Sequence, residues 1–516
     1  MHKNTFIKLI LLLLSFALWG CSNNGTTTAA TTQSVPNGVN LGGMFVLEDW
    51  FFSPNTVGHD VATPCTYEST GIASSRIFAQ SNAVPDFTWT SETNMIKQFL
   101  QNGYTDVQIA ALFKSHRDNY LNQSNNGPKT LDENFAKMQS LGITEVRLPI
   151  TWAITYPDHS YTINPGHGNA VITVPAGTDI TLIQDPFYPD LKWASIPVAE
   201  IMQVLKAAAN HNVKVILDIH AFPGGSSDGT YNGVWPLQPA FWDTGLDSNG
   251  QPIYQQNFQT IFTNLISWTE SLYTLPDQSY ANGLGGLTAM NEPAHLLGIP
   301  QARCTQGSWG ISSYQNVLDT LSLAVSDFGQ SSLPAHGVKL YMNVIETMFP
   351  TTMTATEQYS VLGNWWRSVT TANARQTWAI LDIHHYFAWD PTCNTCLQDH
   401  VSNGIITPAG FAQMKQCSDS WYLTIRSNLR FTAQDLLATS EFSASANQDT
   451  FQSCASGKSQ PISPSNYQAY RNAILQYQIN DAKQAGINAY FWTWMIPYND
   501  NYQNEWALYN ITQQNN

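Results

Sequence analysis

The sequence predicts an α/β fold, a single (β/α)8 TIM barrel with long loop decorations on one face. Short apolar runs of strand type alternate with amphipathic helical stretches, as expected for parallel strands joined by helices. Eight such runs cover residues 38–41, 144–149, 213–219, 286–290, 338–344, 377–383, 435–440 and 487–494. An open doubly wound sheet is the alternative, but it would require a glycine-rich loop and a helix directly after the first strand. The residues from Gly38 to Gly43 lack that continuation.

Helix start signals lie between several of the predicted strands. Thr130 and Glu133 have the spacing of a capping box, and Gly142 follows as a stop signal. Ser195 before Pro197 predicts the start of another helix. These signals support the alternation of strands and helices on which the barrel prediction depends.

The first residues are predicted to direct export rather than to fold. Residues 1–20 have the basic start and the apolar run of a signal peptide, and the run is shorter than the roughly 20 residues of a membrane span. Its end, Leu18-Trp19-Gly20-Cys21, resembles the lipobox of bacterial lipoproteins, so we expect lipid on Cys21 and a membrane-anchored protein of the cell envelope. Ordinary secretion is the alternative.

The rest of the chain divides into a tether and one domain. Residues 21–35 are small and polar, which predicts a flexible tether, and residues 36–516 are predicted to form the catalytic barrel. Two stretches, 53–130 and 155–192, are longer than ordinary connections, so we expect them to decorate the catalytic face.

Composition limits the possible partners. The net charge is −15, only 11% of the residues are charged, and no cluster of Lys and Arg follows a phosphate backbone, so nucleic acid is excluded. With 17 Trp and 22 Tyr, the chain suits neutral polyhydroxylated ligands that have both hydrogen-bonding edges and apolar faces. We expect a monomer whose only membrane contact is the lipid anchor.

Six cysteines remain besides Cys21, and an even number in an exported chain favours up to three disulfides of open connectivity. They are Cys65, Cys304, Cys393, Cys396, Cys417 and Cys454.

The predicted strands end in polar side chains that would be costly to bury without a purpose. Barrel enzymes carry their chemistry at these carboxyl ends. The candidates are Arg147, His220, Asn291, Glu292, His384, Tyr386, Glu441 and Trp492.

Two of these residues, Glu292 and Glu441, end the fourth and seventh predicted strands, which face each other across a barrel mouth. Hydrolysis of a glycosidic bond with retention needs one protonated carboxyl and one carboxylate about 5 to 5.5 Å apart. Pro293 biases Glu292 toward an extended conformation, and Asn291 can hydrogen-bond a sugar hydroxyl. The pair therefore favours a retaining glycoside hydrolase.

The motifs of the chain resemble glycoside hydrolase family 5, the cellulase family, and are most similar to its exo-β-1,3-glucanase branch. They are GVNLGGMFVLEDW at 38–50, TEVRLPITW at 144–152, ILDIHAFPGG at 216–225, NEP at 291–293, DIHHY at 382–386, SEFS at 440–443 and YFWTW at 490–494. The resemblance implies a cofactor-free double displacement on a β-glucan, without metal, with Glu292 as acid/base and Glu441 as nucleophile.

The resemblance also implies roles for supporting residues. Arg147 would lie under the nucleophile, Tyr386 would hydrogen-bond the nucleophile, and the two histidines His220 and His384 would line the subsite of the attacked sugar. The neighbouring His385 would point away and be structural.

Three further residues would contact the sugar. Trp492 would form the floor of the sugar site and precede a cis peptide bond, although Trp494 lies on the same side of the strand. Glu48 would bind hydroxyls at the non-reducing end, and Trp389 stands where the branch has a phenylalanine beyond the cut.

Departures from the branch leave the substrate open. The stretch 224–235 offers Asp228, Tyr231 and Asn232 in a different register, and Met44 and Phe442 replace family residues. An endo-β-1,4-glucanase, a β-1,6- or mixed-linkage glucanase and an enzyme acting on a glucosylated lipid are the alternatives.

Two other classes of protein are weaker alternatives. A metal-dependent hydrolase would use His220, His384, His385 and Asp382, but these supply no ligand set around an open metal position. A surface lipoprotein that binds sugar without turnover would be expected to lack one of the two glutamates, and both are present.

Overall fold

The computed structural model describes residues 34–52, 87, 89–120, 128–227, 229–235, 237, 239–293, 314–344, 348–350, 352–387, 401–445, 464–496 and 505–513. Ser34–Asn516 form one unit. None of the helices within these ranges is both long enough and apolar enough to cross a membrane.

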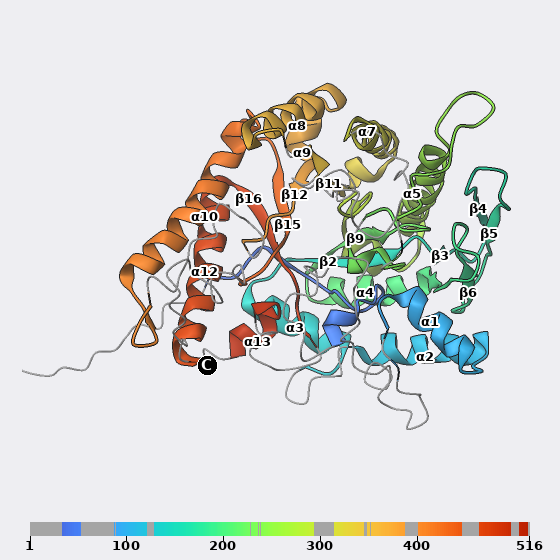
Figure 1. Ribbon diagram of the computed structural model, residues 1–516, viewed down its shortest axis with the longest axis horizontal. Coiled ribbons are helices and arrows are strands. Elements are labelled where there is room, and N and C mark those ends of the chain that lie inside the picture. Colours follow the sequence, from blue (N-terminus) through green and yellow to red (C-terminus); the bar gives the residue numbers. More distant parts are fainter. Residues whose placement is uncertain are drawn as a thin grey trace, which may run out of the picture. The chain divides into compact units, whose positions relative to one another are not determined.

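Eight parallel strands close into a barrel, which confirms the predicted fold (Figure 1). Their order around the barrel is β1, β16, β15, β12, β11, β10, β9 and β2. The bounds are β1 Gly38–Asn40, β2 Glu145–Thr151, β9 Lys214–Ala221, β10 Leu284–Thr288, β11 Lys339–Val344, β12 Ala379–Ile383, β15 Leu437–Phe442 and β16 Ile487–Phe491. Each overlaps one of the eight predicted runs, because a strand covered on both faces is apolar throughout.

Helices connect the strands and surround the barrel (Figure 1). The longer ones are α3 Leu131–Leu141, α4 Val198–Asn210, α5 Ile253–Ser271, α7 Tyr314–Gln330, α8 Ala355–Val369, α10 Pro408–Asn428 and α12 Pro464–Ala485. Shorter helices are α6 Ser279–Gly283, α9 Ala372–Thr377 and α13 Leu508–Gln513, with 3-10 turns η1 Asp49–Phe52, η6 Thr230–Asn232, η7 Leu272–Thr274 and η8 Leu333–His336.

The start of α3 follows the predicted signal in part. The Thr130 hydroxyl accepts the Glu133 N–H at 3.1 Å, and Gly142 ends the helix at φ 86°. The Glu133 carboxylate, however, accepts the N–H of Lys129 instead of that of Thr130, so the box is not reciprocal.

The start of α4 was predicted at Ser195, and this was wrong. The helix begins at Val198, because Ile196–Pro197 form strand β8, which pairs with β3 (Ile154–Thr155). The Ser195 hydroxyl instead accepts the N–H of Thr181 at 2.8 Å.

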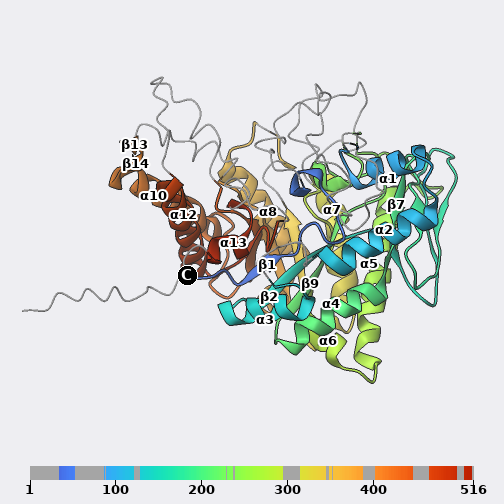
Figure 2. The same cartoon turned by 90° about the horizontal axis from the view of Figure 1, so that it is seen from below.

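Both long insertions carry structure of their own. The segment after β3 forms two antiparallel hairpins, β4 Tyr161–Ile163 with β5 Ile172–Val174 and β6 Leu182–Gln184 with β7 Lys192–Ala194. The earlier insertion contributes α1 Glu92–Gln101 and α2 Asp106–Asn119, and α1 packs against α2 and β7 (Figure 2). A small hairpin, β13 Val401–Ser402 with β14 Ile405–Ile406, precedes α10.

Two tyrosines fill one end of the barrel interior. The hydroxyls of Tyr341 and Tyr490 are 2.7 Å apart, and both rings pack with Ile216 and Ile380. Gly38 makes room for this layer, since a Cβ there would lie 2.2 Å from the Tyr490 ring. This layer of side chains closes one end of the barrel interior.

Candidate active site

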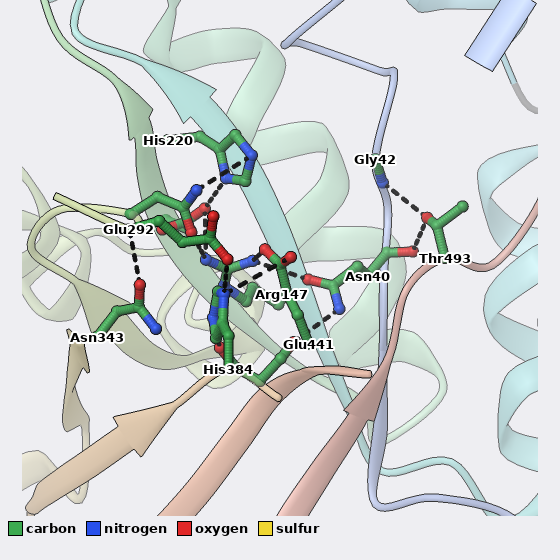
Figure 3. A network of polar contacts seen from close by, with 12 residues as sticks. Asn40, Gly42, Arg147, His220, Glu292, Asn343, His384, Glu441 and Thr493 are labelled. Atoms are coloured by element: carbon green, nitrogen blue, oxygen red, sulfur yellow. Dashed lines mark hydrogen bonds and ion pairs between the residues drawn. The ribbon is translucent and has the colours of Figure 1, made fainter. Parts of the chain in front are cut away.

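The two predicted glutamates lie together at the carboxyl ends of the barrel strands. Glu292 follows β10 and Glu441 lies in β15. One carboxylate oxygen of Glu292, one of Glu441 and one ring nitrogen of His384 all lie within 4.8 Å of one another (Figure 3). Each of the two glutamates is 5% exposed. Side chains separated by about 150 residues thus form one cluster of carboxylates.

Arg147 on β2 contacts the carboxylate of Glu441 from inside the barrel. Its Nη1 donates to Glu441 Oε1 at 2.5 Å, and its Nη2 lies 3.0 Å from the carboxylate of Asp218 (Figure 3). Burial alone would lower the pKa of Arg147, but the charges of Asp218, Glu441 and Asp382 raise it above its ordinary value. The guanidinium therefore stays charged beneath Glu441.

Two amides share the same guanidinium. Nη1 of Arg147 also donates to Asn40 Oδ1 at 3.1 Å, and Nη2 donates to Asn291 Oδ1 at 2.6 Å. Asn40 then donates to the carbonyl oxygens of Ser440 and Phe491 at 2.8 and 3.2 Å. Arg147 and Asn40 therefore connect β1, β2, β15 and β16 directly beneath Glu441.

Glu441 has a second donor in Tyr386. The Tyr386 hydroxyl donates to Glu441 Oε2 at 2.7 Å. Burial first, and then the charges of Glu441 and Glu292, raise the pKa of Tyr386 well above its ordinary value, so the hydroxyl keeps its proton. Arg147 and Tyr386 thus hold one oxygen each of the Glu441 carboxylate.

His384 lies between the two glutamates and a buried aspartate. Its Nδ1 is 2.6 Å from Glu292 Oε1, and its Nε2 is 2.8 Å from the hydroxyl of Ser440. The Ser440 hydroxyl donates to Asp382 at 2.5 Å, so it accepts from His384, and Nε2 carries a proton.

The other ring nitrogen of His384 shares a proton with Glu292. Since Nε2 is a donor, the 2.6 Å contact at Nδ1 holds one proton, either on the carboxyl of Glu292 or on the ring. Burial alone would lower the pKa of His384, but the charge of Glu441 and hydrogen bonds with Asp382 and Glu292 raise it to about 10. At neutral pH, His384 and Glu292 therefore hold a proton between them.

The backbone of Glu292 departs from the extended conformation that Pro293 led us to expect. Its φ is +36°, in the left-handed region that residues other than glycine rarely adopt. The N–H of Glu292 donates to Asn343 Oδ1 on β11 at 2.6 Å (Figure 3). The expectation was wrong because this hydrogen bond comes from a distant strand, which the local sequence does not reveal.

The imidazole ring of His220 and the indole ring of Trp492 pack against each other. His220 and Trp492 are stacked, with ring centroids 5.4 Å apart and an interplanar angle of 7°. Asp218 orients His220 through a 2.6 Å contact at Nδ1. The Trp492-Thr493 peptide bond is cis, as expected.

The structure also distinguishes the neighbouring candidates. Trp494 turns into the helical layer, where its Nε1 donates to Asn134 at 2.7 Å. His385 stacks on Trp421 of α10, with ring centroids 4.3 Å apart. Neither lies at the carboxylate cluster.

Glu48 is buried and held by the loop after β9. It is 3% exposed, and its carboxylate accepts the hydroxyl proton of Thr230 at 2.7 Å. The next residue, Tyr231, packs edge-on against His220, with ring centroids 5.4 Å apart. Burial first, and then the charge of Glu292, raise the pKa of Tyr231 well above its ordinary value.

Some predicted residues lie outside the described part of the chain. These are Trp389, Cys21, Cys65, Cys304, Cys393, Cys396 and Cys454. Cys417 on α10 is disulfide-bonded.

Several residues at the site were not among the predicted ones. Asn40, Asn343 and Ser440 contact the predicted residues directly, and Asp218 lies beneath His220. Asp382, named in the sequence only for the metal-site alternative, contacts Ser440 beside His384. The sequence does carry a signal for Asn343 and Asn40, since each amide stands between two apolar residues of a predicted strand.

The residues suggested for a metal site do not converge on one point. His385 stacks on Trp421, and His220 is held by Asp218. The donor set that does converge within the described residues is Glu292, His384 and Glu441, and Nδ1 of His384 already contacts Glu292.

No family model matches the sequence, and no curated protein is significantly similar to it. Its fold is similar to that of a GH5-4 broad specificity endoglucanase from an uncultured bacterium, with a TM-score of 0.40 and 10% identity over 93% of this chain and 91% of that chain. A glycoside hydrolase family 5 enzyme from Prevotella bryantii has a TM-score of 0.37 and 11% identity, covering 75% of this chain and 85% of that chain.

An endocellulase from Pyrococcus horikoshii, in complex with cellotetraose, has a TM-score of 0.36 and 15% identity, covering 70% of this chain and 78% of that chain. Likeness at such identity concerns the fold alone. Any role for the site residues of this chain must therefore come from their own geometry.

Proposed function

We propose that this protein is a retaining glycoside hydrolase that cleaves a β-glucan by double displacement. The carboxylate spacing is the observation that supports it. One carboxylate oxygen of Glu292 lies within 4.8 Å of one carboxylate oxygen of Glu441, and this closeness agrees with the roughly 5 to 5.5 Å between the carboxyl groups of retaining enzymes.

The surroundings of each carboxyl suggest its role. Glu441 accepts hydrogen bonds from Arg147 and Tyr386, which fix the position of its carboxylate as a nucleophile requires. Glu292 shares a proton with His384, which suits a group that must give a proton and take it back.

The reaction would take two steps. In the first, Glu441 attacks the anomeric carbon while Glu292 gives its proton to the departing glycosidic oxygen, so the C–O bond to the leaving sugar breaks. In the second, Glu292 removes a proton from water, and the resulting hydroxide displaces Glu441 from the sugar. The stacked His220 and Trp492 would support the sugar ring through its C–H face.

The glucan linkage that the enzyme cleaves is proposed from the sequence motifs and from Glu48. The motifs resemble the exo-β-1,3-glucanase branch, and the buried Glu48 would close the pocket at the non-reducing end. The endo-β-1,4-glucanase alternative is represented among similar folds by the endocellulase bound to cellotetraose. Product analysis on β-1,3-, β-1,4-, β-1,6- and mixed-linkage glucans separates these cases, since glucose alone indicates a closed pocket and a ladder of oligomers indicates an open cleft.

A leaving-group comparison tests the mechanism. Glu292→Ala should lose most of its activity on phenyl β-glucoside but little on 2,4-dinitrophenyl β-glucoside, because the activated leaving group needs no proton. Equal losses on both substrates would contradict the role given to Glu292. A wild-type chain that binds glucan without hydrolysing it would favour the sugar-binding lipoprotein instead.

We also propose export and lipid anchoring at Cys21. Labelled fatty acid should enter the wild-type protein and not the Cys21→Ala variant. Label in both variants would contradict lipidation at this residue, and an unlabelled, secreted wild-type protein would support ordinary secretion.

A further inference from the structure

Asn343 has no role in the mechanism above, yet it is hydrogen-bonded to Glu292, the proposed acid/base. Asn343 is 1% exposed and lies near the end of β11, between the buried residues Met342 and Val344. Its Oδ1 accepts the backbone N–H of Glu292 at 2.6 Å, and its Nδ2 lies 3.4 Å from Asp382 Oδ2 (Figure 3). A buried amide needs partners for both ends, and here each end has one.

The hydrogen bond falls on a strained residue. Glu292 has a φ of +36°, in the left-handed region where the Cβ of an L-residue crowds the backbone and makes the conformation unfavourable. Pro293 adds to the constraint, because it disfavours helical conformations of the residue before it. Such a conformation persists only where the surroundings hold it, and Asn343 supplies a buried acceptor for its N–H.

The amide is oriented by a chain of contacts that also reaches the nucleophile strand. Asp382 accepts from Asn343 and from the N–H and hydroxyl of Ser440, at 2.8 and 2.5 Å for the latter two. The hydroxyl of Ser440 accepts from His384, whose other nitrogen contacts the carboxyl of Glu292. These five residues form a closed ring, which we call the amide–carboxylate ring.

This ring fixes the acid/base at two points. His384 contacts the carboxyl of Glu292, and Asn343 contacts its backbone. Ser440, in the same ring, directly precedes Glu441 in the chain. The position of the acid/base is therefore tied to that of the nucleophile across four neighbouring barrel strands.

We propose that Asn343 is a positioning residue that holds the backbone of Glu292 in its left-handed conformation and thereby aims the carboxyl at the glycosidic oxygen. This inference rests on the proposed function, since it assigns to Asn343 an effect on proton donation. Asn343 touches no substrate in this role and acts only through Glu292.

The test is a double-mutant cycle between Asn343→Ala and Glu292→Ala on two aryl β-glucosides. Misplacing a catalytic group by about 1 Å can cost on the order of 100-fold, so Asn343→Ala should lower kcat on phenyl β-glucoside by about 10- to 100-fold. On 2,4-dinitrophenyl β-glucoside the loss should be threefold or less, in round numbers, with KM little changed on both. In the Glu292→Ala background, Asn343→Ala should have no further effect on the phenyl substrate.

A matched control separates positioning from general damage. Asn257 on α5 is also a buried amide, and it bonds to the N–H and the carbonyl of Asn164 at 3.0 and 2.7 Å. Asn257→Ala should lose stability but keep the wild-type ratio of the two activities. If Asn343→Ala does not fold, Asn343→Leu removes the same hydrogen bonds while filling the volume, and the same ratio is measured.

A rescue variant tests the acceptor itself. Asn343→Asp keeps the shape and one oxygen facing the N–H of Glu292, and a proton held between the new carboxyl and Asp382 would replace the amide N–H. It should keep a leaving-group ratio closer to wild type than Asn343→Ala does.

The outcomes distinguish a failure of the role given to Asn343 from a failure of the proposed mechanism. Equal losses on both substrates, additive effects in the double variant, or an Asp variant as impaired as the Ala variant would overturn the role of Asn343. If Glu292→Ala itself shows no dependence on the leaving group, the proposed mechanism fails instead.

Discussion

Replacing Arg147 with lysine probes the charge network beneath the nucleophile. Through two nitrogens, Arg147 makes four contacts of 2.5 to 3.1 Å, with Glu441, Asn40, Asn291 and Asp218. A lysine has a single nitrogen at the end of its chain, so it cannot serve both the Nη1 side and the Nη2 side. One of the two buried carboxylates then loses its cation.

The size of the effect follows from these contacts. Removing one partner of a buried ion pair costs about 3 to 5 kcal/mol. Asp218 would keep His220, and Glu441 would keep Tyr386, so we expect the lower end, about 3 kcal/mol of unfolding free energy. A displaced Glu441 should also lower kcat/KM by about 100-fold.

Urea unfolding and steady-state hydrolysis of an aryl β-glucoside measure both effects. The control is Arg375→Lys, because Arg375 pairs with Asp435 at 3.2 Å and bonds to Thr370, away from the site. It should change kcat/KM little. An Arg147→Lys variant as stable and active as wild type would refute the reasoning, as would an equal loss of activity in the control.

Four further predictions concern the site and its pH dependence. Tyr386→Phe removes a hydrogen bond to the Glu441 carboxylate, which is worth about 1.5 to 3 kcal/mol. We therefore expect kcat to fall about 10- to 100-fold with KM little changed. An unchanged kcat would contradict the role of this hydroxyl. Trp492→Ala should lower kcat/KM by about 10-fold through loss of the stacking surface, and an effect confined to stability would argue against that surface. Burial raises the pKa of Glu505 from 4.5 to about 8, and a hydrogen bond with Ser445 offsets part of this. The folded state therefore holds this proton more tightly, and stability is lost as pH rises from about 4.5 to about 8, by at most about 5 kcal/mol. Glu505→Gln should flatten unfolding free energy over this window, and a curve parallel to wild type would contradict the assignment. Treatment with EDTA should leave hydrolysis unchanged, and a loss restored by a divalent cation would favour a metal-dependent reaction.

The barrel could be predicted because its signal is local. Each strand is covered on both faces, so it appears in the sequence as an apolar run, and all eight runs were found within a few residues. The same logic located the site, since a charged residue such as Arg147 stands out within an apolar run and Glu441 stands out at the end of one.

What the sequence did not reveal depends on contacts between distant segments. The left-handed conformation of Glu292 accompanies a hydrogen bond with Asn343, 51 residues later in the chain. The late start of α4 follows from the pairing of β8 with β3 and from the bond between Ser195 and Thr181. Local propensity carries no information about such partners.

Covalent labelling tests the nucleophile most directly. A 2-deoxy-2-fluoro-β-glucoside with an activated leaving group should form a stable ester with the protein, because fluorine slows the second displacement. Peptide mass spectrometry should find the added sugar on Glu441. A sugar on Glu292 or on any other carboxylate, or turnover that inverts the anomeric configuration, would contradict the account.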